Sequence, residues 1–291
     1  MTGDGVLPVD KPSGPTSHDV VAMARRALGT RRIGHTGTLD PFASGLLLLC
    51  IGRATRIAQY LSDLPKTYIG TLVLGTATDT DDGTGAAMAR SDAWRSVDPA
   101  HIRDALESQR GVRLQVPPAY SAKKVSGQRL HVLARRDAAP VLDPVEVVIH
   151  ELEVVRIQPP EVEFRVTCSA GTYVRAIARD AGERLGTHAH LARLRRTAIG
   201  PHRIDDALPV GRLGDESAVA AAWITTRAAL THLPSVELGS DQERAIGHGM
   251  AVPAPPGTPH GTVVLVRGDR VVAMATHDEG RLRPRKVFTD A

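Results

Sequence analysis

Hydrophobic residues recur along most of this chain with the spacing of helices or strands. Two of the helices that this spacing predicts have clear start signals. Thr16 and Asp19 match a capping box ahead of an apolar stripe that ends at Gly29. Asp98 before Pro99 places an acceptor at the N-cap and proline at the first helical position. Further helices are expected over residues 174–185 and 218–230.

Other segments alternate apolar and polar residues, which is the pattern of a strand with one buried face. Between Val162 and Cys168 every second residue is apolar. A hairpin is expected over residues 263–274, with its turn at Gly268 and Asp269. Because strands and helices mix irregularly and no internal repeat is visible, the predicted fold class is α+β. Strands are also expected over residues 6–9, 66–74 and 145–157.

The length of 291 residues allows one large domain, or one domain with a small appendage. Hydrophobic residues make up 42% of the chain, enough for a core, which excludes global disorder. A domain boundary is expected near residues 233–240. No apolar run approaches the ~20 residues that span a bilayer, and the first residues lack the pattern of a signal peptide. A cytoplasmic protein is therefore expected.

The net charge is +4, and arginine supplies all but five of the 36 basic residues. Because the planar guanidinium group binds phosphate through paired hydrogen bonds, this composition slightly favours a nucleic-acid partner. The two cysteines, Cys50 and Cys168, lie in apolar segments and are too few for a disulfide framework or a zinc site. We expect buried thiols at both positions.

Several common cofactor and metal sites are excluded by the motifs that the chain lacks. Neither the G-x-G-x-x-G fingerprint nor the G-x-x-x-x-G-K-[ST] phosphate loop occurs. Residues 79–83 resemble the start of a calcium loop, but Arg90 stands where such a loop has its glutamate. We therefore expect a solvated acidic turn there. His188 and His190 have no third ligand nearby, so no zinc site is expected.

The first segment with candidate catalytic residues is the glycine-rich stretch from Gly34 to Gly45. Small residues on both sides of Asp40 leave space around its carboxylate, and His35 lies a few residues earlier. A substrate could therefore reach Asp40. The alternative is a glycine-rich loop in which Asp40 and Pro41 form an ordinary turn.

A second candidate segment follows a predicted buried strand and begins a helix. It places Tyr173 and Arg175 in the first helical turn. Aromatic residues make up 3% of the chain, so a tyrosine in a polar turn is not ordinary core filler. Arg175 could pair with a carboxylate and hold it ionised. The alternative is a capping turn with a surface arginine.

Two basic segments have the composition of RNA-contacting surfaces. Residues 115–124 combine prolines with one aromatic residue and a lysine pair, and cations continue to Arg136. A solvated helix face accounts for the later part of this segment nearly as well. Residues 190–197 form a basic patch in which Leu191 and Leu194 have the spacing of one helical face.

Taken together, these segments resemble the bacterial tRNA pseudouridine-55 synthases of the TruB type. The motifs that carry the resemblance occur in the family's order over residues 10–196, and the similarity fades after about residue 232. These motifs are Asp10-Lys11-Pro12-Ser13-Gly14, Gly34-His35-Thr36-Gly37-Thr38-Leu39-Asp40-Pro41, Lys66-Thr67-Tyr68, Pro117-Pro118-Ala119-Tyr120-Ser121-Ala122-Lys123, Ser169-Ala170-Gly171-Thr172-Tyr173-Val174-Arg175 and Leu194-Arg195-Arg196.

The resemblance implies that Asp40 is the catalytic residue. It places a histidine near the flipped uridine and an aromatic ring on the face of the base. The substrate-binding positions of the family are matched by His35, Tyr68, Tyr173, Arg175 and Leu194. Contacts with the RNA backbone are expected from Lys11, Lys123, Lys124, Arg136, Arg195 and Arg196.

The implied reaction converts uridine 55 in the T-arm of tRNA to pseudouridine, without a metal or cofactor. The family detaches uracil from C1′, rotates it and rejoins it through C5. A carboxylate can assist as a nucleophile at the sugar, or by removing a sugar proton to give a glycal. The target base must leave the stack at a cost of a few kcal/mol. Stacking on an aromatic face recovers about 1–3 kcal/mol.

The implied fold is an α+β core whose mixed, mainly antiparallel sheet is flanked by helices, followed by a small PUA-like β-rich domain. We expect residues 1–232 to form the catalytic domain, with an RNA-clasping insertion at about 111–145. Residues 240–291 are expected to form the C-terminal RNA-binding domain. The expected partner is the T-arm stem-loop of tRNA, bound by a monomer.

Two other functions share parts of this pattern. A non-catalytic RNA-binding or RNA-folding protein could keep the pocket as a remnant, although the presence of Asp40, Tyr68 and Arg175 together argues against it. A uracil-excising glycosylase would also flip a base and use a carboxylate. It would release free uracil, whereas a synthase retains every atom of its substrate.

Overall fold

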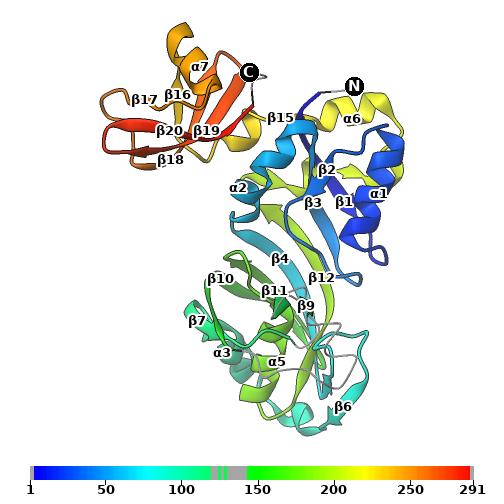
Figure 1. The fold of residues 1–291 in the computed structure, drawn as a ribbon. Coiled ribbons are helices and arrows are strands. Elements are labelled where there is room, and N and C mark those ends of the chain that lie inside the picture. Colours follow the sequence, from blue (N-terminus) through cyan, green and yellow to red (C-terminus); the bar gives the residue numbers. More distant parts are fainter. Residues whose placement is uncertain (1–2, 119–123, 126–127, 130–142, 289–291) are drawn as a thin grey trace.

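Two large sheets organise the chain in the computed structural model, which describes residues 3–118, 124–125, 128–129 and 143–288 (Figure 1). The larger sheet has the order β14-β1-β3-β12-β4-β11-β10-β7, with β2, β13 and β15 paired beside this path, and the second has the order β16-β18-β19-β20-β17. In the larger sheet β1 pairs with β14 and β3 with β12 in parallel, and the other described pairs are antiparallel. The expected α+β class with a mixed, mainly antiparallel sheet is confirmed.

The strands of the larger sheet are β1 (Gly5–Lys11), β2 (Ile33–His35), β3 (Ser44–Ile51), β4 (Lys66–Leu74), β7 (Gly111–Gln115), β10 (Val145–Gln158), β11 (Glu161–Cys168), β12 (Ala189–Ile199), β13 (His202–Arg203), β14 (Leu208–Pro209) and β15 (Ile224–Thr225). The second sheet contains β16 (Ser235–Glu237), β17 (Val252–Pro253), β18 (Gly261–Arg267), β19 (Arg270–Asp278) and β20 (Arg281–Val287). Two small pairs are β5 (Thr76–Thr78) with β6 (Ala87–Arg90), and β8 (Lys124–Val125) with β9 (Gln128–Arg129).

The described helices are α1 (Ser17–Ala27), α2 (Ala58–Ser62), α3 (Pro99–Glu107), α5 (Val174–Arg184), α6 (Glu216–Ala222) and α7 (Ser240–Gly247). Short 3₁₀ turns are η1 (Gly52–Ile57), η2 (Ala93–Ser96), η3 (Ile204–Asp206), η4 (Val210–Arg212) and η5 (Ala228–Leu230).

The helix starts follow local sequence. Thr16 accepts a hydrogen bond from the backbone N–H of Asp19, and the carboxylate of Asp19 accepts one from the N–H of Thr16, which completes the predicted capping box of α1. Asp98 accepts from the N–H of Ala100 at the start of α3, where Pro99 takes the first helical position. Both caps satisfy N–H groups that a helix leaves unpaired, so both starts are confirmed.

Strand β3 is apolar from Leu46 to Ile51 because both of its faces are buried there. Leu46, Leu48 and Cys50 belong to a cluster that includes η1, η5 and part of the second sheet. The alternate residues of β3 pack in a different cluster, against α1 and η4. Since successive side chains of a strand point to opposite faces, only a continuous apolar run can fill both layers. By contrast β11 alternates, with Val162 and Phe164 buried and Arg165 exposed.

The second sheet shares a hydrophobic cluster with the first part of the chain. Val264 and Met274 from this sheet are buried in the same cluster as Val6 and Leu230. Arg53 also donates a 2.6 Å hydrogen bond to a carbonyl oxygen just after β20. The second sheet therefore packs on the core. Removing it would expose apolar side chains, so an experiment on its role needs point substitutions.

The basic segment at residues 190–197, expected to be helical, is strand β12. The pairing of β12 with β4 shifts register between Leu191 and Arg193, which marks a β-bulge. The extra residue brings Leu191 and Leu194 to one face although they are three positions apart. This spacing imitates a helix, and for that reason the helical prediction was wrong here.

The helix predicted over residues 218–230 is also wrong in its extent. Helix α6 ends at Ala222, and Trp223 adopts an extended conformation. Strand β15 then pairs with β1, and the indole of Trp223 lies directly over Gly5, where a Cβ atom would come within 2.4 Å of the ring. Tertiary packing therefore interrupts an alanine-rich stretch with good helix propensity.

Candidate active site

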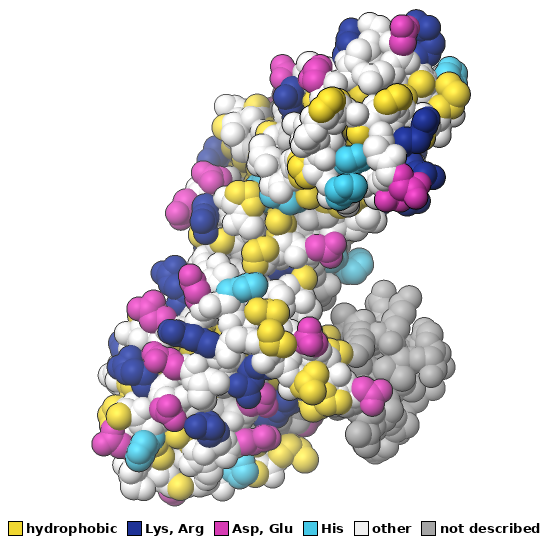
Figure 2. All heavy atoms as spheres, turned by 90° about the vertical axis from the view of Figure 1, so that its left-hand side faces the viewer, with side chains coloured by type: hydrophobic (Ala, Val, Ile, Leu, Met, Phe, Trp, Pro, Cys, Tyr) yellow, Lys and Arg dark blue, Asp and Glu magenta, His cyan; other side chains and the backbone are white. Residues whose placement is uncertain are grey.

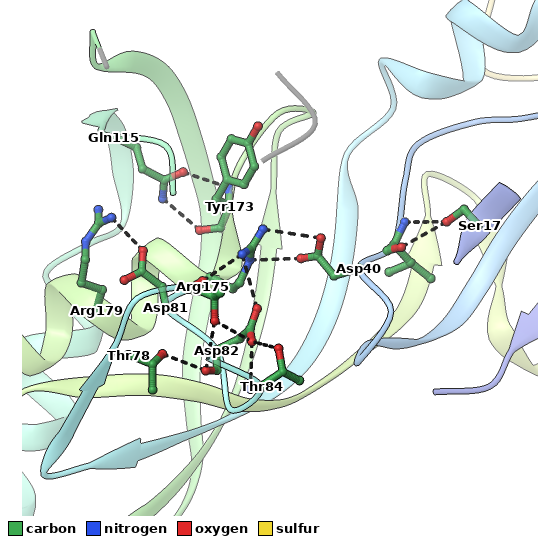
Figure 3. Close-up of polar contacts among 12 residues, drawn as sticks. Ser17, Asp40, Thr78, Asp81, Asp82, Thr84, Gln115, Tyr173, Arg175 and Arg179 are labelled. Carbon is green, nitrogen blue, oxygen red and sulfur yellow. Dashed lines mark hydrogen bonds and ion pairs between the residues drawn. The ribbon is translucent and has the colours of Figure 1, made fainter. Parts of the chain in front are cut away.

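The loop that carries Asp40 joins β2 to β3 and is held by the start of α1. The N–H of Leu39 donates a 2.9 Å hydrogen bond to Oγ of Ser17, which donates in return to the carbonyl of Leu39 at 3.2 Å (Figure 3). The N–H of Gly14 donates to the carbonyl of Pro41 at 2.8 Å. The backbone on both sides of Asp40 is therefore fixed before any ligand binds.

Two buried cations hold the same loop from inside. Nζ of Lys11 donates to the carbonyls of Pro12, Pro15 and Pro41 at 3.0, 2.8 and 3.4 Å. Arg196 donates through Nε to Leu46 at 2.7 Å and through Nη2 to Gly37 at 3.2 Å. Lys11 is 0% exposed and Arg196 is 1% exposed. Their charged groups contact carbonyls of the protein itself, and the expected contact of either side chain with the RNA backbone stays a prediction.

Arg175 lies between two carboxylates (Figure 3). Its Nε is 3.1 Å from Oδ2 of Asp40, and its Nη1 is 3.3 Å from Oδ2 of Asp82. The same Nη1 donates to the carbonyl of Thr80 at 2.8 Å. The side chains of Arg175 and Asp82 are 5% and 6% exposed, whereas that of Asp40 is 37% exposed. Of this triad, Asp40 is thus the member that a substrate can reach.

Asp82 was expected in a solvated acidic turn, and the structure corrects this. Its Oδ1 accepts hydrogen bonds from the hydroxyl of Thr80 at 2.9 Å and from the N–H and hydroxyl of Thr84 at 3.0 and 2.6 Å. The bond from the N–H of Thr84 is the local turn that aspartate commonly makes, and it was visible in the sequence. The pairing with Arg175, 93 residues away, was not.

The pKa of the Asp40 carboxyl is raised above its ordinary value. Burial is the largest cause, and the neighbouring carboxylate of Asp82 adds to it. Arg175 lowers the pKa, as its placement in the sequence led us to expect, and Lys11 acts in the same direction. Burial outweighs these attractions. Asp40 is therefore a more basic carboxylate than one in water, which suits a group that must bond to carbon or accept a proton.

Asp40 opens into a cleft of about 240 Å³ between its loop, β4, β12 and the start of α5. Four of the expected substrate-binding residues line it together with Asp40, namely Tyr68, Tyr173, Arg175 and Leu194. The other lining residues are Gly37, Thr38, Leu39, Ser62, Lys66, Ser169, Gly171, Thr172, Val174 and Arg196. Segments far apart in the sequence thus form one site that combines a carboxylate, aromatic rings and cations.

Tyr173 is placed by a residue that sequence reasoning missed. The amide of Gln115 accepts from the N–H of Tyr173 at 2.8 Å and donates to its carbonyl at 3.2 Å (Figure 3). Gln115 ends strand β7, which pairs with β10 at the edge of the larger sheet. Residues 111–115 therefore belong to the sheet and not to the inserted arm expected at about 111–145.

His35 does not line the cleft. It ends β2, and its ring meets that of His18 edge-on at 5.1 Å between centroids. Burial, together with the nearby His18 and Arg196, lowers the pKa of His35 to about 4, so its imidazole is neutral at pH 7. The expected contact of His35 with the substrate stays a prediction.

Of the remaining cations expected on RNA, Arg195 is exposed and bonds both carboxylate oxygens of Asp10, at 3.1 and 2.8 Å. Lys124 lies in β8, whereas Lys123 and Arg136 lie outside the described residues. In the view of Figure 2, dark-blue Lys and Arg side chains are interspersed with magenta Asp and Glu.

Comparison with known proteins decides the family. Residues 25–174 match the sequence model for "TruB family pseudouridylate synthase (N terminal domain)". The chain belongs to this family. It is 42% identical to tRNA pseudouridine synthase B of Thermobifida fusca over 98% of both chains. It is 39% identical to the protein of the same name from Geobacter sulfurreducens, over 98% of this chain and 99% of the relative.

Solved structures extend the TruB family similarity to the fold. A chain of an archaeal box H/ACA small ribonucleoprotein complex is 27% identical, with a TM-score of 0.74, and the match covers 98% of this chain and 86% of that one. A chain of an H/ACA ribonucleoprotein bound to a substrate RNA containing 2′-deoxyuridine is 26% identical, with a TM-score of 0.75 over 98% and 85%. The matches include the second sheet, since they cover almost the whole chain.

In the described part of this TruB family chain, no helix is long and apolar enough to cross a membrane.

Proposed function

We propose that this chain isomerises uridine 55 in the T-arm of tRNA to pseudouridine, with Asp40 as the catalytic residue. The observation that carries the proposal is the partly exposed Asp40 carboxylate, paired with buried Arg175 at 3.1 Å in a cleft walled by Tyr68. Relatives named tRNA pseudouridine synthase B, at about 40% identity over nearly the whole chain, support the same substrate.

In the proposed reaction the C1′–N1 bond breaks and its electron pair leaves with uracil. The base turns within the cleft, C5 bonds to C1′, the C5 proton is lost and N1 gains a proton, so the product has the mass of the substrate. Asp40 serves either as nucleophile at C1′ or as base for a sugar proton. Both roles need an ionised carboxylate that is open to the ligand, and Arg175 favours this charge.

The cleft supports recognition of a base that has left its stack. Tyr68 is 8% exposed and Leu194 is 9% exposed, so each presents only an edge of an otherwise buried side chain to the ligand. A uracil ring placed on Tyr68 would gain about 1–3 kcal/mol from stacking, which offsets much of the cost of flipping. Burial raises the pKa of Tyr68, so its hydroxyl stays neutral.

We also propose that residues 1–232 act as the catalytic domain and residues 240–291 as an RNA-binding domain. A cavity of about 640 Å³ between the two sheets supports this, because four arginines surround it. The arginines are Arg53, Arg227, Arg267 and Arg270. Two carboxylates, those of Asp4 and Asp269, also line the cavity. Such a surface suits phosphate contacts, which position RNA without reading a base. One chain supplies the whole catalytic cleft, in keeping with a monomer that works on tRNA in the cytoplasm.

The decisive experiment uses a T-arm stem-loop transcript and the full chain. Conversion of one uridine without a change in RNA mass, detected by carbodiimide labelling at position 55, is the expected result. Release of free uracil would instead identify a glycosylase. Tight RNA binding with neither product would identify the non-catalytic RNA-binding protein.

The inserted segment can be tested for its proposed grip on the RNA backbone. Replacing Lys123, Lys124 and Arg136 together by alanine should make RNA affinity less dependent on salt. Each lost phosphate contact lowers the slope of log K against log salt by roughly 0.7–0.9. An unchanged slope would exclude this segment as a backbone clamp.

A further inference from the structure

Lys66 is the first residue of β4 and lines the catalytic cleft. It lies two positions before Tyr68, so the two side chains emerge on the same face of the strand. The residue is 6% exposed, which makes it one of the few buried charged groups of the chain. In the sequence, Lys66 belongs to the motif Lys66-Thr67-Tyr68, and the family resemblance assigns it no role.

The ammonium group of Lys66 is poorly satisfied. An ammonium has three N–H donors, and within the described residues the one hydrogen bond of Nζ is to the carbonyl of Ser62. No carboxylate of the described chain lies within ion-pair distance of it. A buried cation with unused donors is costly unless a partner arrives. The cleft that it lines is where such a partner would bind.

Lys11 shows what a purely structural buried lysine looks like in this protein. Its Nζ has three carbonyl acceptors, one for each N–H, and Lys11 does not line the cleft. Lys66 has one acceptor and does line it. The two lysines are similarly buried, so the difference lies in what their donors are free to bind.

The charged groups around Lys66 leave it available for an acceptor. Burial and the nearby Arg196 of β12 lower its pKa to about 8, while Cys168 of β11 and Asp63 after α2 raise it. The ammonium form therefore still predominates at pH 7. A negatively charged or strongly polar oxygen in the cleft would be stabilised by this cation and would satisfy its remaining donors.

We propose that Lys66 is a second catalytic residue, whose ammonium group donates a hydrogen bond to a carbonyl oxygen of the flipped uracil. The proposal rests on the isomerisation proposed above. When the C1′–N1 bond breaks, uracil leaves with the electron pair, and the negative charge spreads from N1 onto O2 and O4. Lys66 stabilises that charge without transferring a proton, and it keeps the base in the cleft while the ring turns to present C5.

The first test replaces Lys66 by methionine, which keeps the length of the side chain and removes the charge. Because a single donor to a developing oxyanion commonly contributes 10²–10³ in rate, we expect the single-turnover rate to fall roughly 100-fold. RNA affinity should change by less than about 3-fold, since the lost contact acts mainly after the bond begins to break. A rate within 3-fold of wild type would overturn the proposal.

The second test separates this role from a structural one. T-arm substrates with 2-thiouridine or 4-thiouridine at the target position replace one carbonyl oxygen by sulfur, a weaker acceptor. For the contacted carbonyl, the ratio of wild-type to Lys66→Met rates should shrink at least 10-fold relative to uridine, as in a double-mutant cycle. Equal ratios for all three substrates would show that Lys66 only supports the fold.

Two controls keep the outcomes distinct. If wild type does not convert uridine, the proposed function fails, and the role of Lys66 fails with it for that separate reason. If thermal unfolding shows that Lys66→Met is not folded, the same comparison of thio-substrates is made with Lys66→Gln. The wild-type rate should also fall as the pH rises through about 8, where Lys66 loses its proton. A rate that is level through pH 9 counts against the ammonium form.

Discussion

The cations around the catalytic cleft and the arginines of the second sheet have similar chemistry and opposite surroundings. Lys11, Arg175 and Arg196 are at most 4% exposed and bind backbone carbonyls or carboxylates inside the protein. The side chains of Arg270 and Arg283 are about half exposed and pair with Glu243 and Glu279, whose side chains are 22% and 78% exposed. Exposed pairs contribute about 0–1 kcal/mol, whereas breaking a buried pair costs about 3–5 kcal/mol.

This difference assigns different tasks to the two sets. The buried cations fix the loop of Asp40, and their positive charge is already matched by internal partners. The surface arginines can exchange a glutamate for a phosphate at little cost, because water and salt already weaken their pairs. Basic residues that look alike in the sequence therefore divide into those that hold the site and those for which we propose contact with RNA.

The largest effect on the rate should come from replacing Asp40, the carboxylate that the buried cations position. Asp40→Asn should lower the single-turnover rate by roughly 10⁴-fold or more, because the amide keeps the shape and loses the charge and basicity. RNA affinity should stay within about 3-fold by filter binding. Asp10→Asn is the matched control, since Asp10 also pairs with an arginine but lies outside the cleft. Near-normal turnover of the Asp40 variant would move the chemistry to another residue.

The contrast between buried and exposed arginines can be tested by replacing one arginine of each kind. Arg175→Met leaves the carboxylates of Asp40 and Asp82 without their shared cation, and should lower the free energy of unfolding by about 3–5 kcal/mol. It should also raise the pKa of Asp40 further and reduce the rate more than RNA affinity. Arg195→Met removes a pair whose two side chains are 44% and 29% exposed, so it should cost less than about 1 kcal/mol. Equal losses of stability in denaturant titrations would contradict the distinction.

A smaller effect should appear as acid sensitivity. The pKa of His35 is about 4 in the folded chain and about 6.5 when unfolded, so the unfolded state binds more protons between these values. Stability is therefore fully present above about pH 6.5 and is lost as the pH falls towards 4, by roughly 3 kcal/mol in total. The lowered pKa values of His202 and His232 act in the same direction.

His35→Gln should reduce the change in the free energy of unfolding between pH 7 and pH 5. The substitution should alter the free energy of unfolding less at pH 7.5 than its pH dependence below pH 7. An unchanged slope would mean that His202 and His232 dominate the acid response. His18→Gln removes one of the neighbours that lower the pKa of His35, so it should weaken the pH dependence less than His35→Gln does.

The smallest effect should come from the second sheet. Replacing Arg267 and Arg270 by glutamine should weaken binding of whole tRNA several-fold and lower its salt dependence, while a minimal T-arm hairpin is bound and converted as before. The substitutions leave the shared hydrophobic cluster intact, so thermal unfolding should change little. Equal losses for tRNA and hairpin would remove the proposed role of this sheet.

Much of the fold was predictable because its signals are local. The capping box at Thr16, the N-cap at Asp98 and the hairpin that turns at Gly268 all depend on neighbouring residues. The family resemblance identified Asp40, Tyr68, Tyr173, Arg175 and Leu194, and the structure brings these five into one cleft. It did not identify Asp82 or Gln115, whose contacts with the site cross 93 and 58 positions of the chain.

The sequence by itself determined the α+β class, the caps and turns, and the family to which the chain belongs. Only the tertiary structure decided which charges are buried. Lys11 and Arg196 have the same side chains as RNA-binding residues, but Arg196 is held by the carbonyls of Leu46 and Gly37, and Lys11 by that of Pro41 as well as by two local carbonyls. The bulge in β12 likewise depends on its partner β4. Burial and pairing are properties of contacts between distant segments, and periodicity along one segment carries no record of them.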